Sequence, residues 1–363
     1  GIYTLYRHDA LPSEPTGVLT PQETDELFRI FTSLKEQGVT IILITHKLRE
    51  IMSITDQVSV MRDGKMVAHR QTNETSFEEL AELMIGRKVL LNIDKSESKS
   101  GSPVLKVKNL HVSNEQGIER VKDVSFEVCS GEVLGIAGVT GNGQGTLLKA
   151  LTGILPLTEG SIEVFGEIIT SNNHLGPKIL RELGIAHVPE DRQGMGLITE
   201  FSASESALLG YHNDKQLNQG LWLKKSLVRD NCESLMSAFD VRPADPKLKS
   251  SNFSGGNQQK LIVAREFERN PEVLIIGQPT RGVDIGAIEF IHKRIIAMRD
   301  AGKAVVLVSV ELEEIMSLSD RIIVMCDGQI TGKVDAIDAE ERTLGMMMAN
   351  VLNPSETNQE AQP

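Results

Sequence analysis

The chain has 363 residues, of which 40% are hydrophobic, so it is long enough for one large or two smaller domains with a sizeable core. Its 50 acidic and 38 basic residues give a formal net charge of −12, which disfavours nucleic-acid binding through phosphate neutralisation. The three cysteines have no metal-ligand spacing. No apolar run reaches the roughly 18 residues that span a bilayer. We therefore predict no nucleic-acid partner, no metal site and no transmembrane segment.

In chain order, the apolar run TIILIT (40–45) predicts a buried strand. A polar segment that ends in proline predicts a linker at 93–103, and the last residues, 351–363, predict a disordered tail. Between the linker and the tail, apolar β-branched strand patterns alternate with helical ones. The strands are expected at 104–112, 121–128, 132–138, 272–277 and 304–310, and the helices at 146–153 and 286–302. This alternation predicts an α/β fold with a parallel sheet.

The sequence contains an internal repeat. The stretch from Glu14, EPTGVLTPQETDELF, is similar to the stretch from Gln278, QPTRGVDIGAIEFIH, at an offset of 264 residues. The same offset aligns LREIMSITDQVSVMRDG (48–64) with LEEIMSLSDRIIVMCDG (312–328) without a gap. The second copy follows a long segment, about 102–279, that the first copy lacks. We predict one structural unit that occurs twice, with its first copy truncated.

A glycine-rich loop joins the strand at 132–138 to the following helix. This context is typical of a phosphate-binding loop, G-x-x-x-x-G-K-[ST], whose backbone N–H groups converge on an anion at a helix N-terminus. Gln144 stands at the lysine position, and a neutral amide can donate hydrogen bonds to phosphate but supplies no charge. The alternative is an ordinary glycine-rich turn. The candidate phosphate-binding residues are Gly138, Gly141, Asn142, Gly143, Gln144, Gly145 and Thr146.

A second motif, FSGGNQQKLIVAREF (253–267), runs into a segment with helical spacing. It resembles the signature motif of ABC-type ATPases, which in that family clasps the γ-phosphate of ATP bound to the opposite domain. A helix N-terminus with a serine hydroxyl and glycine N–H groups supplies suitable donors for an anion. The resemblance therefore assigns nucleotide contacts to Ser254, Gly255, Gly256, Asn257 and Gln258.

The resemblance also assigns roles within VLIIGQPTRGVD. Gly277 stands at the position of the magnesium aspartate, Gln278 at that of the general-base glutamate, and Asp284 at that of the D-loop aspartate. Val310 replaces the switch histidine, and Pro189 lies in the loop that normally carries a glutamine. Gln278 and Asp284 are expected to lie at the nucleotide, but this copy lacks the consensus catalytic groups.

The first copy keeps catalytic groups that the second has lost. Glu14 matches the base glutamate and His46 the switch histidine, with expected roles in polarising the attacking water and holding it near the γ-phosphate. The first copy has neither a phosphate loop nor a signature motif. In the family, each site joins the loop of one domain to the signature of the other, which assigns Glu14 and His46 to a site with Ser254–Gln258.

Together these motifs are similar to the fused ATP-binding subunits of bacterial importers for simple sugars, such as ribose and galactosides, or for nucleosides. The resemblance covers about 14–350. It implies a P-loop NTPase-like ABC ATPase domain with a parallel-rich sheet, an antiparallel β part and a helical subdomain, plus a partial second copy. The implied domains are a truncated first domain (1–92), the linker (93–103) and a complete, degenerate second domain (104–350), followed by the tail.

The resemblance further implies ATP as the ligand, with Mg²⁺ weak or absent at the second-domain site. The implied partners are transmembrane permease subunits, through them a periplasmic or lipoprotein solute-binding protein, and a further ATP-binding subunit. The implied location is cytoplasmic, peripheral on the inner face of the bacterial membrane. We expect this chain alone to hydrolyse ATP very slowly or not at all.

Three alternatives stay open. The first is a non-hydrolysing regulatory or structural ATP-binding module, which the replaced catalytic groups favour for the isolated chain. The second is the remnant of a truncated importer subunit. The third is a soluble ABC protein that acts in translation or DNA repair, which the acidic balance and the sugar-importer motifs disfavour.

Overall fold

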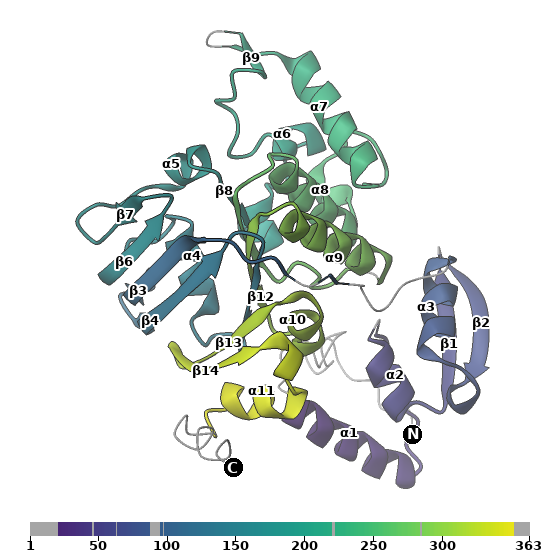
Figure 1. Ribbon diagram of the computed structural model, residues 1–363. Helices are drawn as coiled ribbons and strands as arrows, with labels where there is room; N and C mark the ends of the chain where they lie inside the picture. Colours follow the sequence, from purple (N-terminus) through teal and green to yellow (C-terminus); the bar gives the residue numbers. More distant parts are fainter. Residues whose placement is uncertain are drawn as a thin grey trace. The chain divides into compact units, whose positions relative to one another are not determined.

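The structure is a computed structural model of the chain, and it describes residues 21–45, 47–62, 64–87, 95–96, 98–219, 222–283 and 285–351. The chain divides into two units by its internal contacts (Figure 1). The first comprises Gly1–Asn92 with Asp284–Glu289, and the second comprises Ile93–Val283 with Phe290–Pro363.

The second unit is built on a six-stranded sheet with the order β14-β13-β5-β12-β11-β8. All neighbours are parallel except β14, which pairs antiparallel with β13 at one edge. The predicted parallel sheet is therefore confirmed. Its inner strands are apolar along their whole length because both faces are covered. The bounds are β5 Val133–Ala137, β8 Ile185–Val188, β11 Val273–Gly277, β12 Ala304–Ser309, β13 Arg321–Cys326 and β14 Gln329–Asp335.

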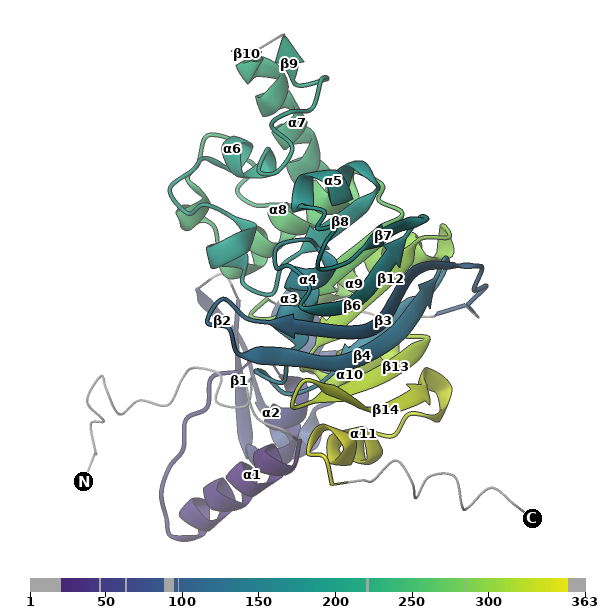
Figure 2. The ribbon, with the colours of Figure 1, turned by 90° about the vertical axis from the view of Figure 1, so that its left-hand side faces the viewer.

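A second, antiparallel sheet of four strands, ordered β4-β3-β6-β7, packs with helix α4 (Gln144–Leu151) on one face of the parallel sheet. Figure 2 shows its strands side by side. Their bounds are β3 Pro103–Ser113, β4 Glu119–Cys129, β6 Glu159–Val164 and β7 Glu167–Ile169. This sheet supplies the antiparallel β part that the resemblance implies.

The parallel sheet separates two hydrophobic cores, because successive side chains of a strand point to opposite faces. Along β12, Val306 and Val308 pack into the core shared with α4 and the antiparallel sheet. Val305 and Leu307 pack into the core on the other face, which helices between residues 203 and 348 cover. Those helices include α8 Gly255–Phe267, α9 Ile285–Asp300, α10 Leu312–Leu318 and α11 Glu341–Met348.

A mainly helical part follows the π-helical turn at Arg192–Gly196. It contains a long helix, α7, whose buried residues pack against α6 and α8. Within the residues that the structure describes, no helix is long and apolar enough to cross a bilayer. The elements of this part are α6 Ala203–Ala207, β9 Asn218–Gln219, β10 Trp222–Leu223 and α7 Lys225–Ala238, and the short helix α5 Pro177–Glu182 precedes it.

The first unit contains α1 Pro21–Glu36, α2 Leu48–Ile54, β1 Gln57–Arg62, β2 Lys65–Gln71 and α3 Phe77–Ile85. Its core is small and includes Leu48, Ile51, Val58, Val60 and Leu80. These five elements begin 264 residues before α9, α10, β13, β14 and α11, in the same order. The predicted repeat therefore extends from the sequence to the secondary structure.

The prediction of a buried strand at 40–45 is wrong. The structure has no strand there, and Ile42 and Ile44 are 88% and 78% exposed. The equivalent segment of the second copy, β12, is buried because it lies between β5 and β11. In the described part of the first unit, the strand pairing is limited to β1 with β2, so 40–45 has no neighbour with which to form a ladder.

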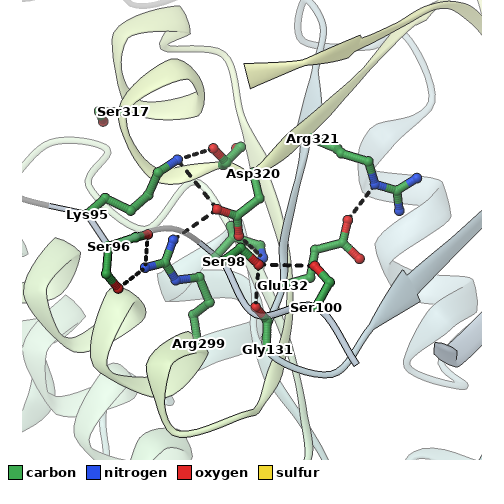
Figure 3. Close-up of polar contacts among 12 residues, drawn as sticks. Lys95, Ser96, Ser98, Ser100, Gly131, Glu132, Arg299, Ser317, Asp320 and Arg321 are labelled. Carbon is green, nitrogen blue, oxygen red and sulfur yellow. Dashed lines mark hydrogen bonds and ion pairs between the residues drawn. The ribbon is translucent and has the colours of Figure 1, made fainter. Parts of the chain in front are cut away.

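The described part of the expected linker is tied to the second unit. The guanidinium of Arg299 donates to the Ser96 carbonyl at 3.0 Å and to Asp320 Oδ1 at 2.9 Å (Figure 3). Ser98 Oγ donates to the Gly131 carbonyl at 2.9 Å. These contacts hold the chain beside β5 before β3 begins. Most of the expected tail, 352–363, lies outside the described residues.

Candidate functional site

The glycine-rich loop lies between β5, at the centre of the parallel sheet, and the N-terminus of α4. Gly141 and Gly143 have φ values of +97° and +101°, a conformation that residues with a side chain rarely adopt. Gly143 is the N-cap of α4, so the loop delivers free backbone N–H groups to the first turn of that helix. This geometry is that of an anion-binding turn.

Gln144 is the first residue of α4, and its side chain is folded into the loop. The residue is 4% exposed, and its Nε2 has no hydrogen-bond partner among the described residues. A methyl group added at Gly138 would lie 1.9 Å from this nitrogen, so only glycine leaves room for the amide. A buried donor without a partner is costly, so this amide is available to a ligand that reaches the loop.

A cavity of about 590 Å³ opens over the loop. Its walls come from the loop, from α4, from β8 with the segment that follows it, and from the turn between β3 and β4. Lys149 on α4 lines it and pairs with Glu115 at 3.2 Å. The cavity thus combines backbone donors with side chains of both charges. The residues that line the cavity include Gly141, Gly143, Gly145, Thr146, Lys149, His187 and Glu190.

Two ionisable groups of the cavity have shifted pKa values. Burial lowers the pKa of His187 to about 4, although Glu266 opposes the shift, so the imidazole is neutral near pH 7. Burial also raises the pKa of Glu190, against the opposing effects of Arg281, Lys149 and a hydrogen bond from Gln278. Both shifts indicate that this wall of the cavity is poorly solvated.

The strand β11 ends at Gly277, which offers no side chain to the cavity. Gln278 follows with a φ of +49°, and its backbone N–H donates to the Val308 carbonyl at 2.8 Å. Its side-chain Oε1 accepts a hydrogen bond from the Val310 N–H at 3.3 Å. The residues at the base and switch positions therefore contact each other.

The signature motif forms the start of α8. Ser254 is its N-cap, and the Ser254 Oγ accepts hydrogen bonds from the side chain of Asn257 at 2.9 Å and from its backbone N–H. Gln258 is buried, donates to the Ser250 carbonyl at 2.9 Å and accepts from Gln193. Residues 254–258 are not part of the cavity wall, so the structure places the loop and the signature motif of this unit at separate sites.

Three predicted site residues, Glu14, His46 and Asp284, lie outside the described residues. Pro189 lies in the cavity wall, but the residue beside it, Glu190, was missed by the sequence reasoning. A signal was available, because Glu190 is a charged residue two positions after an apolar strand of a parallel sheet, where ligand sites concentrate. Lys149 was also not predicted, because its sequence context does not distinguish it from a solvent-exposed lysine on a helix.

Comparisons with known proteins agree with this geometry. Residues 121–281 match the family described as ABC transporter. The chain is 43% identical over 347 residues to the nucleoside import ATP-binding protein NupA of Lactococcus lactis, and 46% identical over 348 residues to the guanosine import ATP-binding protein NupO of Bacillus subtilis. Each alignment covers 95% of this chain and 68% of the relative. A glucose import ATP-binding protein of Haloferax volcanii is 40% identical over 92% of this chain and 61% of the relative.

Solved structures show the same fold. A nucleotide-free ATP-binding cassette from an ABC transporter matches with a TM-score of 0.55 and 22% identity, over 72% of this chain and 100% of the other. A dimeric cassette bound to ADP and phosphate matches with a TM-score of 0.54 and 23% identity, over 64% of this chain and 98% of the other. The loop, the capped signature helix, the fold and the relatives agree, and the chain therefore belongs to the family of ATP-binding proteins of ABC transporters.

Proposed function

We propose that this chain is the ATP-binding subunit of an importer and that its second unit binds ATP at the cavity over the glycine loop. The observation that carries the proposal is the cavity over the glycine loop, whose wall includes Gly141, Gly143, Gly145 and Thr146 at the N-terminus of α4. The backbone N–H groups at Gly143–Thr146 would surround the phosphates, and the Gln144 amide would donate to them without adding charge. Binding ATP would supply the missing hydrogen-bond acceptor.

The residues of this site do not fit the magnesium ion that ABC ATPases use. The phosphate-loop pattern has its magnesium-binding hydroxyl at the position of Gly145, and the resemblance places the magnesium aspartate at Gly277. Neither residue has a side chain beyond hydrogen. Within the described ranges, no group of three His, Cys, Asp or Glu side chains could hold a metal ion. Gln278 and Val310 offer no general base, so we propose that this unit binds ATP without hydrolysing it.

We further propose that the chain holds one whole ATP-binding unit and part of another. The repeat at an offset of 264 residues and the 68% coverage of NupA and NupO support this organisation. The proposed transported solute is a nucleoside or a sugar. Nucleosides are favoured, because two relatives named for nucleoside or guanosine import are 43% and 46% identical to this chain.

The proposed import function also implies partners. We propose that it acts with transmembrane permease subunits at the cytoplasmic face of the membrane, and that a solute-binding protein and a further ATP-binding subunit complete the complex. The import activity named for NupA and NupO supports these partners. We propose catalytic roles for Glu14 and His46. We propose that Asp284 contacts the nucleotide.

Calorimetric titration of the whole chain with ATP tests the proposed site. The Gln144→Ala variant should bind ATP several-fold more weakly, since it loses a hydrogen-bond donor to phosphate. The matched control is Gln259→Ala, because Gln259 is also buried and its Nε2 also has no partner among the described residues, yet it lies on α8 and not at the glycine loop. Equal ATP affinity for Gln144→Ala and wild type would contradict the proposal, as would rapid phosphate release.

A further inference from the structure

Glu190 lies in the wall of the cavity, just after β8, and its side chain extends across two glycines. A methyl group added at Gly145 would lie 2.6 Å from Glu190 Oε2. A methyl group added at Gly277 would lie 2.5 Å from Glu190 Cγ. The carboxyl group of Glu190 therefore fills space that is open only because both positions are glycine.

This placement puts a carboxyl group at the first turn of α4. Gly145 is the second residue of the helix, and the helix N-terminus favours a negative charge there. A phosphate bound by the glycine loop would lie at the same turn. Two negative groups cannot both occupy this turn at close range without strong repulsion.

The charged groups around Glu190 offset its burial only in part, and Arg120 on β4 is a further cation in the cavity wall. Lys149 on α4 and Arg281, in the turn after β11, lower the pKa of Glu190, but burial raises it further than they lower it. Lys149 is also paired with Glu115. On β8, His187 is neutral near pH 7, and Asp191 accepts hydrogen bonds from the N–H groups of Gln193 and Gly194. Gln278 contributes a neutral amide.

We propose that Glu190 determines how much negative charge the cavity accepts, and that a nucleotide binds to the second unit with uptake of one proton by the Glu190 carboxyl. This inference depends on the proposed ATP site. The protonated carboxyl removes the repulsion and can donate a hydrogen bond to a phosphate oxygen, and the proton comes from water. The cavity consequently disfavours ATP relative to ADP, because ATP carries more negative charge.

The test is calorimetric titration of the whole chain with ATP and with ADP, without divalent cations, at about pH 6 and about pH 8. Repeating each titration in two buffers with different ionisation enthalpies measures the proton uptake directly. For the wild type, affinity should fall as pH rises, because the proton is harder to supply. The Glu190→Gln variant should bind ATP roughly tenfold more tightly at the higher pH, the effect of one pKa unit, with a smaller preference for ADP.

Controls separate the possible outcomes. The phosphate of the nucleotide titrates near pH 6, but its contribution is the same in wild type and variant. Glu182→Gln, which removes an equal charge from the exposed face of α5, should leave ATP affinity unchanged. At about pH 8, well above the titration of the nucleotide phosphate, proton uptake by the wild-type chain tests the proposal even if Glu190→Gln does not fold.

Three results would overturn this inference. The first is ATP binding that Gln144→Ala weakens and Glu190→Gln leaves unchanged, which would keep the proposed function and reject the role of Glu190. The second is ATP binding that requires Mg²⁺ in the wild type and loses this requirement in Glu190→Gln, which would make Glu190 a cation ligand. The third is no binding of ATP or ADP by any variant, which would reject the proposed function as well.

Discussion

The segments 40–45 and 304–309 occupy equivalent places in the two copies of the repeat, and both are apolar. In the second copy the segment forms β12, in which Val306 is fully buried between β5 and β11. In the first copy the segment is not a strand, and Ile42, the counterpart of Val306, is 88% exposed. An apolar pattern thus gives a buried strand only where neighbouring strands are present to pair with it.

An ion pair shows the same contrast. Arg299 and Asp320 pair at 2.9 Å in the second copy, with side chains 1% and 12% exposed. Their counterparts Lys35 and Asp56 also pair at 2.9 Å in the first copy, with side chains 35% and 77% exposed. The ion pair is present in both copies, but it is buried only in the second copy.

The largest expected difference between the two copies is the loss of stability when a charge is introduced into the apolar segment. Val306→Asp should destabilise the second unit by about 4 kcal/mol or more, because it buries a charge without a partner. The matched change Ile42→Asp should alter stability by less than about 0.5 kcal/mol, because the side chain is exposed. Urea unfolding followed by circular dichroism measures both effects. A large loss of stability in Ile42→Asp would show that 40–45 is buried and that the comparison is wrong.

Removing the ion pair should also cost more stability in the second copy than in the first, but by a smaller margin than the change to the apolar segments. Asp320→Asn removes one of the two carboxylates that pair with the buried Arg299, leaves Asp300 as the other, and should cost about 2 kcal/mol. Asp56→Asn removes an exposed pair and should cost no more than about 1 kcal/mol. Hydrogen exchange of backbone amides near each pair reports the loss of local stability. Equal effects of the two changes would show that burial does not determine the strength of this contact.

The smallest difference concerns the N-caps of the last helices of the two copies. Ser76 caps α3 by accepting a hydrogen bond from the Glu79 N–H, whereas Glu340, its counterpart at α11, makes no side-chain cap. Ser76→Ala should cost about 1 kcal/mol, and Glu340→Ser should stabilise α11 by up to about 1 kcal/mol. Exchange rates of the amides in α3 and α11 measure these changes. Slower exchange in Ser76→Ala would contradict the assigned cap.

The sequence predicted five strands and two helices of the second unit, because each of these elements carries its own periodicity or turn signal. The strand patterns at 121–128 and 304–310 and the glycines of the phosphate loop are local features of this kind. Glu190 was not predicted, because its importance arises from two glycines that are distant in sequence, Gly145 and Gly277. No local pattern links these three positions.

The sequence by itself determined the repeat, the α/β pattern and the motifs of the ATP-binding family, since these depend on residue types at fixed spacing. Only the tertiary structure decided which apolar segment is buried, which ion pair is desolvated and which carboxyl group lies at the α4 N-terminus. These properties depend on the neighbours that the fold brings into contact, and both burial and electrostatic energy are set by those neighbours rather than by position along the chain.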